Sequence, residues 1–96
     1  MLRIGTACGS GLGSSFMVEM NIEKILKNKN VDMSEVKVDH YDLGNASRGD
    51  ADIWIVGKDL ENSVSHLGDV RFLNSIIDLD ELEGVVDQII KEKDLG

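Results

Sequence analysis

The chain has 96 residues, 42% of them apolar, and a formal net charge of −8. This length supports one modest hydrophobic core, so residues 1–96 are interpreted as a single domain. The excess of acidic side chains repels a phosphate backbone and argues against nucleic-acid binding. Cys8 is the only cysteine, which excludes an internal disulfide, and with two histidines it provides too few soft ligands for a structural zinc site.

No basic leader with an apolar stretch precedes the first predicted strand. No apolar run approaches the roughly 20 residues that a membrane-spanning helix needs. We therefore expect a cytoplasmic protein with a reduced thiol and no direct membrane insertion. No metal or cofactor is indicated.

The first third of the chain predicts a strand, a loop and a helix. The strand covers Leu2 to Ala7, and the segment CGSGLGSS at residues 8–15 is too rich in glycine for a helix or strand interior. A helix is predicted from about Ser14 to Lys27, with Ser14 or Ser15 as its cap. Its apolar residues recur at helical spacing: Val18, Ile22, Ile25 and Leu26.

The middle of the chain predicts two further strands. Val36 to Tyr41 alternates apolar and polar residues, as a half-buried strand does. Residues 42–51 are rich in turn formers, with room for one helical turn at most. Asp52 to Gly57 is almost continuously apolar and predicts a central strand that is buried on both faces.

The last third predicts a short helix, a strand and a long helix. The short helix covers Lys58 to His66, and the fourth strand covers Val70 to Leu73. The final helix has Asp78 or Asp80 as its N-cap and two lysines near its end, where they complement the helix dipole. Its apolar face consists of Leu79, Leu82, Val85, Val86, Ile89 and Ile90.

This alternation of strands and helices predicts an α/β fold, because parallel neighbours need crossover connections. We expect a small, open, doubly wound, four-stranded parallel sheet of order 2-1-3-4, with helices on both faces, of the flavodoxin/Rossmann-like type. Ligands of such sheets bind beyond the carboxyl ends of the strands, where the winding reverses. Here that place is the glycine-rich loop after the first strand.

The loop joins a thiol at a strand end to backbone amides that open a helix. Such amides and the helix dipole attract an anion, either a phosphate group or the thiolate itself. A cysteinyl phosphate satisfies both preferences. The sequence therefore predicts Cys8 as the nucleophile that carries a phosphoryl group, in a phosphate-binding loop of Gly9, Ser10, Gly11, Leu12, Gly13, Ser14 and Ser15.

Most other interpretations of the loop disagree with particular residues in it. A cysteine at the end of a strand is often a plain apolar residue, and a triphosphatase P-loop needs a lysine that the segment lacks. A dinucleotide fingerprint fails because its third glycine position holds Ser14. Low-molecular-weight thiol phosphatases and arsenate reductases have an arginine at that position, so hydrolysis should be poor. A non-catalytic, regulatory domain that binds a phosphate-bearing ligand remains open.

The chain also resembles a known family. The Cys-Gly-x-Gly-x-Gly-Ser-Ser arrangement at residues 8–15, the helix SSFMVEMNIEKIL and the strand ADIWIV resemble enzyme IIB components of the bacterial phosphotransferase system (PTS), closest to the ascorbate and galactitol class. The resemblance implies a sugar phosphotransferase in which the phosphohistidine of a IIA component donates to Cys8. Cys8 would then donate to a sugar-like substrate, such as ascorbate or galactitol, in a membrane-embedded IIC component. The chain differs from the family in Leu12, where a polar residue is usual, and in a shortened segment at residues 44–49.

The positions of several other residues in the predicted elements indicate where their side chains lie. Leu12 is expected to contact a partner, while Phe16 or Met17 is expected to face the sheet in part. Trp54 is expected in the core. Asp59 follows the third strand and can line the site. His40 and His66 are isolated in the sequence, and neither is assigned a role.

Overall fold

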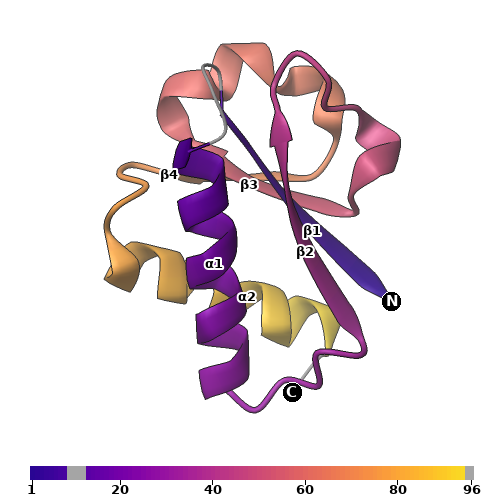
Figure 1. The fold of residues 1–96 in the computed structure, drawn as a ribbon, viewed down its shortest axis with the longest axis vertical. Coiled ribbons are helices and arrows are strands. Elements are labelled where there is room, and N and C mark those ends of the chain that lie inside the picture. Colours follow the sequence, from indigo (N-terminus) through magenta and orange to yellow (C-terminus); the bar gives the residue numbers. More distant parts are fainter. Residues whose placement is uncertain (9–12, 95–96) are drawn as a thin grey trace.

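The computed structural model describes residues 1–8 and 13–94 (Figure 1). The strands are β1 (Leu2–Cys8), β2 (Val36–Asp42), β3 (Ile53–Gly57) and β4 (Val70–Leu73). The α-helices are α1 (Gly13–Asn28) and α2 (Leu79–Lys93), and three short 3-10 helices are η1 (Arg48–Asp50), η2 (Lys58–Ser63) and η3 (Ser65–Leu67). The predicted strands and long helices are confirmed to within one or two residues.

The strands form one parallel sheet of order β2-β1-β3-β4, which confirms the predicted topology. Cys8 lies opposite Asp42 in β2, and Gly57 lies opposite Leu73 in β4. Thr6 pairs with Ile55, and both lie two residues before the ends of their strands. The register therefore aligns the carboxyl ends of all four strands along one edge of the sheet.

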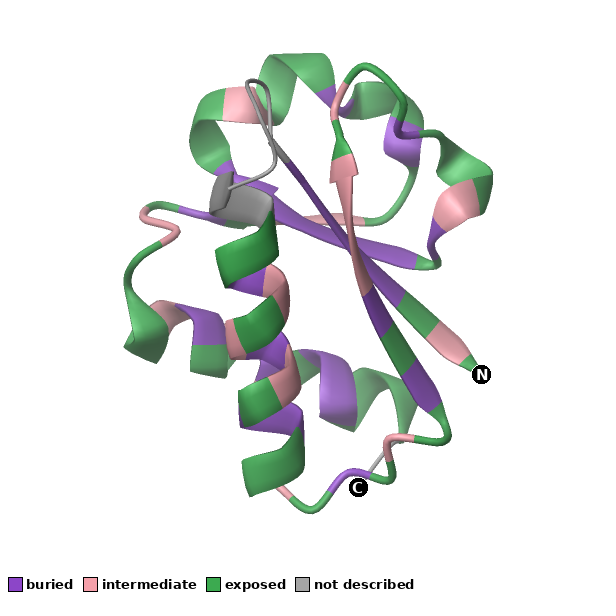
Figure 2. Cartoon of the chain, viewed as in Figure 1, coloured by how far each residue is buried: buried purple, intermediate pink, exposed green. Residues whose placement is uncertain are grey.

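The two α-helices pack on the same face of the sheet. Alternation along β3 directs Ile53 and Ile55 into this layer, where they meet Ile22, Leu26 and Leu82. All of these side chains are buried, and the exposed residues lie on the outer surfaces of the helices (Figure 2). Neither α1 nor α2, the long helices of the described chain, has the length and apolarity to cross a membrane.

The opposite face is covered by the 3-10 helices and their connections, which gather at the top of Figure 1. Trp54 and Val56 of β3 point into this layer and meet Val64 and Leu67. Helices therefore cover both faces, as predicted, but they are α-helices on one face and 3-10 helices on the other. The single short helix predicted at residues 58–66 is two 3-10 helices, because buried Val64 adopts the non-helical angles φ −119° and ψ 12° between them.

The two α-helices begin differently. α2 is capped by Asp78, whose side chain accepts hydrogen bonds from the backbone N–H groups of Asp80 and Glu81. α1 begins at Gly13, so Ser14 and Ser15 lie inside the helix and not at its cap, and its first turn contains no acidic residue. α2 thus satisfies its own N-terminal amides with carboxylates, whereas the first turn of α1 supplies none.

Arg71 connects the edge strand β4 to the last turn of α2. Its guanidinium donates to both carboxylate oxygens of Glu92, at 2.8 and 2.9 Å, and to those of Asp69, at 2.9 and 3.2 Å. These hydrogen bonds lower the pKa of both carboxyl groups and raise the pKa of Arg71. The pair of forked contacts fixes the end of α2 on the sheet.

Gly5 occupies a position in β1 that leaves no room for a side chain. A Cβ there would lie 2.8 Å from Cζ3 of Trp54. We predict that Gly5→Ala lowers the free energy of unfolding by about 2 kcal/mol, because the Trp54 ring must shift in a filled core. Urea denaturation measures this. Gly84→Ala is the matched control: a Cβ at that exposed helical position has open space, so it should stabilise by about 0.5–1 kcal/mol.

The contacts of Arg71 predict a pH dependence of stability. Because Asp69 and Glu92 have lowered pKa values in the folded state, their contribution is complete above the ordinary carboxyl pKa, near 4. It is lost as the pH falls through their lowered values. Arg71→Gln should therefore reduce stability modestly at pH 7 and hardly at pH 2, as urea unfolding at both pH values can measure. Lys91→Gln removes only an exposed pair with Asp87 and should change stability less at pH 7; an equal loss would contradict the assignment.

Candidate functional site

The end of β1 and the start of α1 meet at the carboxyl edge of the sheet (Figure 1). Cys8 is the last residue of β1, between the ends of β2 and β3, and α1 begins at Gly13. Backbone geometry thus places the predicted nucleophile where ligands of open parallel sheets bind. Of the predicted phosphate loop, Gly9, Ser10, Gly11 and Leu12 lie outside the described residues. Their role, with that of Gly13, Ser14 and Ser15, stays a prediction.

Two carboxylates lie at the same edge. Asp42 ends β2 opposite Cys8, and its side chain accepts from the N–H of Gly44 at 3.3 Å and from Nδ2 of Asn45 at 3.4 Å. The side chain of Asp59 lies over Gly57 at the end of β3.

A hydrogen bond between α1 and β2 was missed by the sequence analysis. Nδ1 of His40 lies 2.8 Å from Oε1 of Glu19, and the Glu19 side chain is only 13% exposed. The Phe16 ring packs against the imidazole with centroids 5.3 Å apart. Nothing in the sequence links two residues that are 21 positions apart. The one available signal was that Glu19 is the sole charged residue between Gly13 and Ile22.

Three apolar side chains near the start of α1 are exposed. Phe16 is 49% exposed, Met17 37% and Met20 54%. Phe16 meets the expectation of a partial contact with the sheet through His40, but Val18 and Ile22 supply the buried face. These exposed apolar side chains stand out in a chain whose net charge is −8. Leu12, the residue predicted to contact a partner, lies outside the described residues.

His66 and Trp54 belong to the 3-10 face. Nε2 of His66 lies 3.3 Å from the carbonyl oxygen of Ala46, to which it donates. Trp54 is fully buried and packs on Tyr41 with centroids 5.1 Å apart, which confirms that it is a core residue. Both residues stabilise the connections over that face, and neither shares the α1 side of the sheet with His40.

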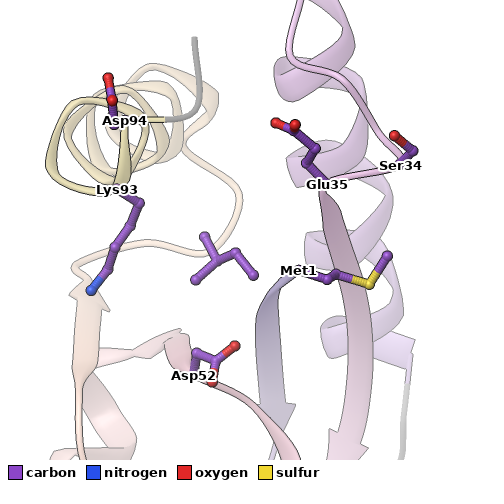
Figure 3. Close-up of a pocket in the computed structure, with 7 residues that line it drawn as sticks. Met1, Ser34, Glu35, Asp52, Lys93 and Asp94 are labelled. Carbon is purple, nitrogen blue, oxygen red and sulfur yellow. The ribbon is translucent and has the colours of Figure 1, made fainter.

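A hollow at the opposite end of the molecule is shown in Figure 3. Its lining comes from the residues before β1, β2 and β3 and from the end of α2: Met1, Leu2, Ser34, Glu35, Asp52, Lys93 and Asp94. Asp52 is engaged there by the backbone N–H of Arg3 at 2.8 Å and by its guanidinium at 3.2 Å. The hollow therefore lies at the amino ends of the strands, away from Cys8. Among residues 1–8 and 13–94, no cluster of three His, Cys, Asp or Glu side chains is arranged to hold a metal.

The fold is similar to a solved structure, the lactose-specific IIB component domain of the phosphoenolpyruvate:carbohydrate phosphotransferase system from Streptococcus pneumoniae. The TM-score is 0.56 at 15% sequence identity, and the alignment covers 95% of each chain. At this identity the likeness concerns the fold. No curated protein matches the chain.

A family model described as "PTS system, Lactose/Cellobiose specific IIB subunit" matches residues 3–88. This match confirms the expected IIB component and its phosphotransferase character. It does not confirm the ascorbate and galactitol class, which is a different subclass. The sheet has the order β2-β1-β3-β4 with a cysteine at the end of β1, and the family model covers most of the chain. The chain therefore belongs to the lactose/cellobiose-specific IIB family of the phosphotransferase system.

Proposed function

We propose that the protein is a cytoplasmic phosphocarrier whose phosphoryl acceptor is Cys8. Its proposed donor is the phosphohistidine of a IIA component, and its acceptor is a carbohydrate bound by a membrane IIC component. Membership of the IIB family supports a role in sugar phosphotransfer. The proposed phosphate loop consists of Gly9, Ser10, Gly11, Leu12, Gly13, Ser14 and Ser15.

One observation carries this proposal: Cys8 ends a central strand, and the next element, after residues 9–12, is a helix whose first turn has no acidic residue. Free N–H groups and the helix dipole at such a helix start favour negative charge, including a thiolate or a phosphoryl group. α2 differs because the carboxylate of Asp78 already accepts from its first amides. Of the two long helices, α1 is therefore the one suited to receive an external anion.

The proposed transfer proceeds in two balanced steps. The Cys8 thiolate attacks phosphorus, an S–P bond forms, and the N–P bond of the donor breaks to release its imidazole. A carbohydrate hydroxyl then attacks the same phosphorus, an O–P bond forms, and the S–P bond breaks to regenerate the thiolate, while the hydroxyl proton passes to solvent or to a base on the partner. Each step moves a phosphoryl group between nucleophiles, so the protein mainly supplies position and neutral donors.

The residues at the carboxyl edge favour transfer over hydrolysis. No arginine or lysine occurs between Cys8 and Ser15, so this segment lacks the guanidinium with which thiol phosphatases stabilise the charge of the transferring group. Asp42 and Asp59 at the strand ends further oppose a tightly held dianion. A group bound by amides and hydroxyls can leave readily once an acceptor is in line.

The first test is phosphorylation of the whole chain with phosphoenolpyruvate, the general phosphotransferase proteins and a IIA component. IIA components of the lactose/cellobiose and of the ascorbate/galactitol classes are each supplied, because the substrate class follows the partner. We predict a mass gain of one phosphoryl group in the wild type and none in Cys8→Ser, since a serine hydroxyl is a far weaker nucleophile than a thiolate at neutral pH.

Three other results would count against this function. A gain that persists in Cys8→Ser would place the phosphoryl group elsewhere. No gain with any donor, together with inorganic phosphate binding that Cys8→Ser leaves intact, would favour a non-catalytic binding domain. Rapid hydrolysis of p-nitrophenyl phosphate would favour a thiol phosphatase. Circular dichroism of Cys8→Ser controls for its folding.

A further inference from the structure

The hydrogen bond between Glu19 and His40 involves the only charged side chain at the start of α1. Between Gly13 and Ile22 the helix contains no other Asp, Glu, Lys or Arg. The Glu19 side chain turns toward β2, where Oε1 lies 2.8 Å from Nδ1 of His40. Since an ionised carboxylate only accepts, Nδ1 carries the hydrogen and donates it. Within the part of the chain that the structure describes, the imidazole of His40 is the hydrogen-bond donor to the Glu19 carboxylate.

The pair lies close to the end of β1. His40 stands opposite Thr6, two residues before Cys8. Glu19 is six residues beyond Gly13, which places its Cα about 9 Å along the helix axis from the start of α1. Helical side chains lean toward the N-terminus, so the carboxylate is displaced toward the helix start. The Phe16 ring packs against the imidazole at a tilt of 45°.

We propose that His40 is a positioning residue of the Cys8 site, which acts by binding the carboxylate of Glu19. The hydrogen bond disperses the negative charge of Glu19, the one charged side chain in the first turns of α1. Without His40, a largely buried carboxylate remains unpaired about 10 Å from the anion-binding end of α1. This inference rests on the proposed function, because it assigns a supporting residue to the same site.

The other charged groups near the pair do not replace His40. On β2, Asp42 is acidic and accepts from Gly44 and Asn45. On α1, the next charged residue after Glu19 is Glu23, one turn farther from the helix start. Both carry the same sign of charge as Glu19. Removal of the imidazole therefore leaves the carboxylate without compensation from these neighbours.

The size of the effect follows from Coulomb's law. A unit charge about 10 Å from a forming anion, at an effective dielectric constant of about 20, changes an equilibrium roughly tenfold. Salt reduces this value. A hydrogen bond disperses only part of the Glu19 charge, so the full unit charge sets the upper limit, and we expect effects of about threefold to tenfold on the reactivity of Cys8.

Because Cys8 is the only cysteine, alkylation by iodoacetamide reports its thiolate directly and needs no partner protein. His40→Phe keeps an aromatic ring beside Phe16 but removes the donor. We predict that it shifts the alkylation profile to higher pH and slows alkylation at pH 7 by about threefold to tenfold. Glu19→Asp keeps the charge but shortens the side chain, so it should slow alkylation similarly even if His40→Phe folds poorly.

Removal of the charge should restore the reactivity. The double variant His40→Phe/Glu19→Gln has no donor and no carboxylate, and it should be alkylated at least as fast as the wild type because the charge that opposes the thiolate is gone. His40→Gln, which keeps an N–H donor, should behave like the wild type. Glu92→Gln, which breaks the remote contact with Arg71, is the matched control and should leave alkylation unchanged.

The same variants are then phosphorylated by the IIA component. His40→Phe should lower kcat by about threefold to tenfold with little change in KM, and the double variant should recover. Wild-type alkylation in His40→Phe, or a double variant as slow as the single one, would overturn this inference. If Cys8 is phosphorylated but the alkylation profile of His40→Phe is unchanged, this inference fails and the proposed function stands. The predicted alkylation cycle without phosphorylation by any donor would contradict the proposed function alone.

Discussion

The pairing of β1 with a parallel strand on each side is the constraint on which the rest of the structure depends. Hydrogen bonds to β2 and β3 fix the register of β1, so the position of Cys8 at the carboxyl edge is set by the backbone ladder. A parallel neighbour can be reached only by a crossover, which here contains α1. The strand order therefore brings a strand end and a helix start together without any side-chain contact being required.

The two faces of the sheet differ in the contacts that cover them. Trp54 fills the space above Gly5 on the 3-10 face, where the chemistry consists of packing and backbone contacts. The α face combines a deep core around Ile22 and Leu26 with the Glu19–His40 pair and the apolar outer turns of α1. The exposed apolar side chains of α1 therefore stand on a helix that is anchored in the core of this face.

Local patterns predicted most of this fold. The alternation in β2, the apolar run in β3 and the Asp78 cap of α2 each follow from one short segment, and the strand order followed from the crossovers. The break in the helix at Val64 was missed because the burial of this side chain depends on packing against the sheet, which the local sequence does not reveal. The contact of Glu19 with His40 was missed for a similar reason: helical periodicity sorts residues by face but does not tell which strand residue a polar side chain will meet.

The absence of an acidic residue from the first turn of α1 has a consequence for the stability of the whole domain. In a phosphocarrier of this design, the cargo would complete the helix that holds it, as Asp78 completes α2. Loading and folding would then be thermodynamically linked, and the loaded protein would resist heat and denaturant better than the empty one. Discharge to an acceptor would remove that added stability, so the stability of the domain would rise and fall with each turnover.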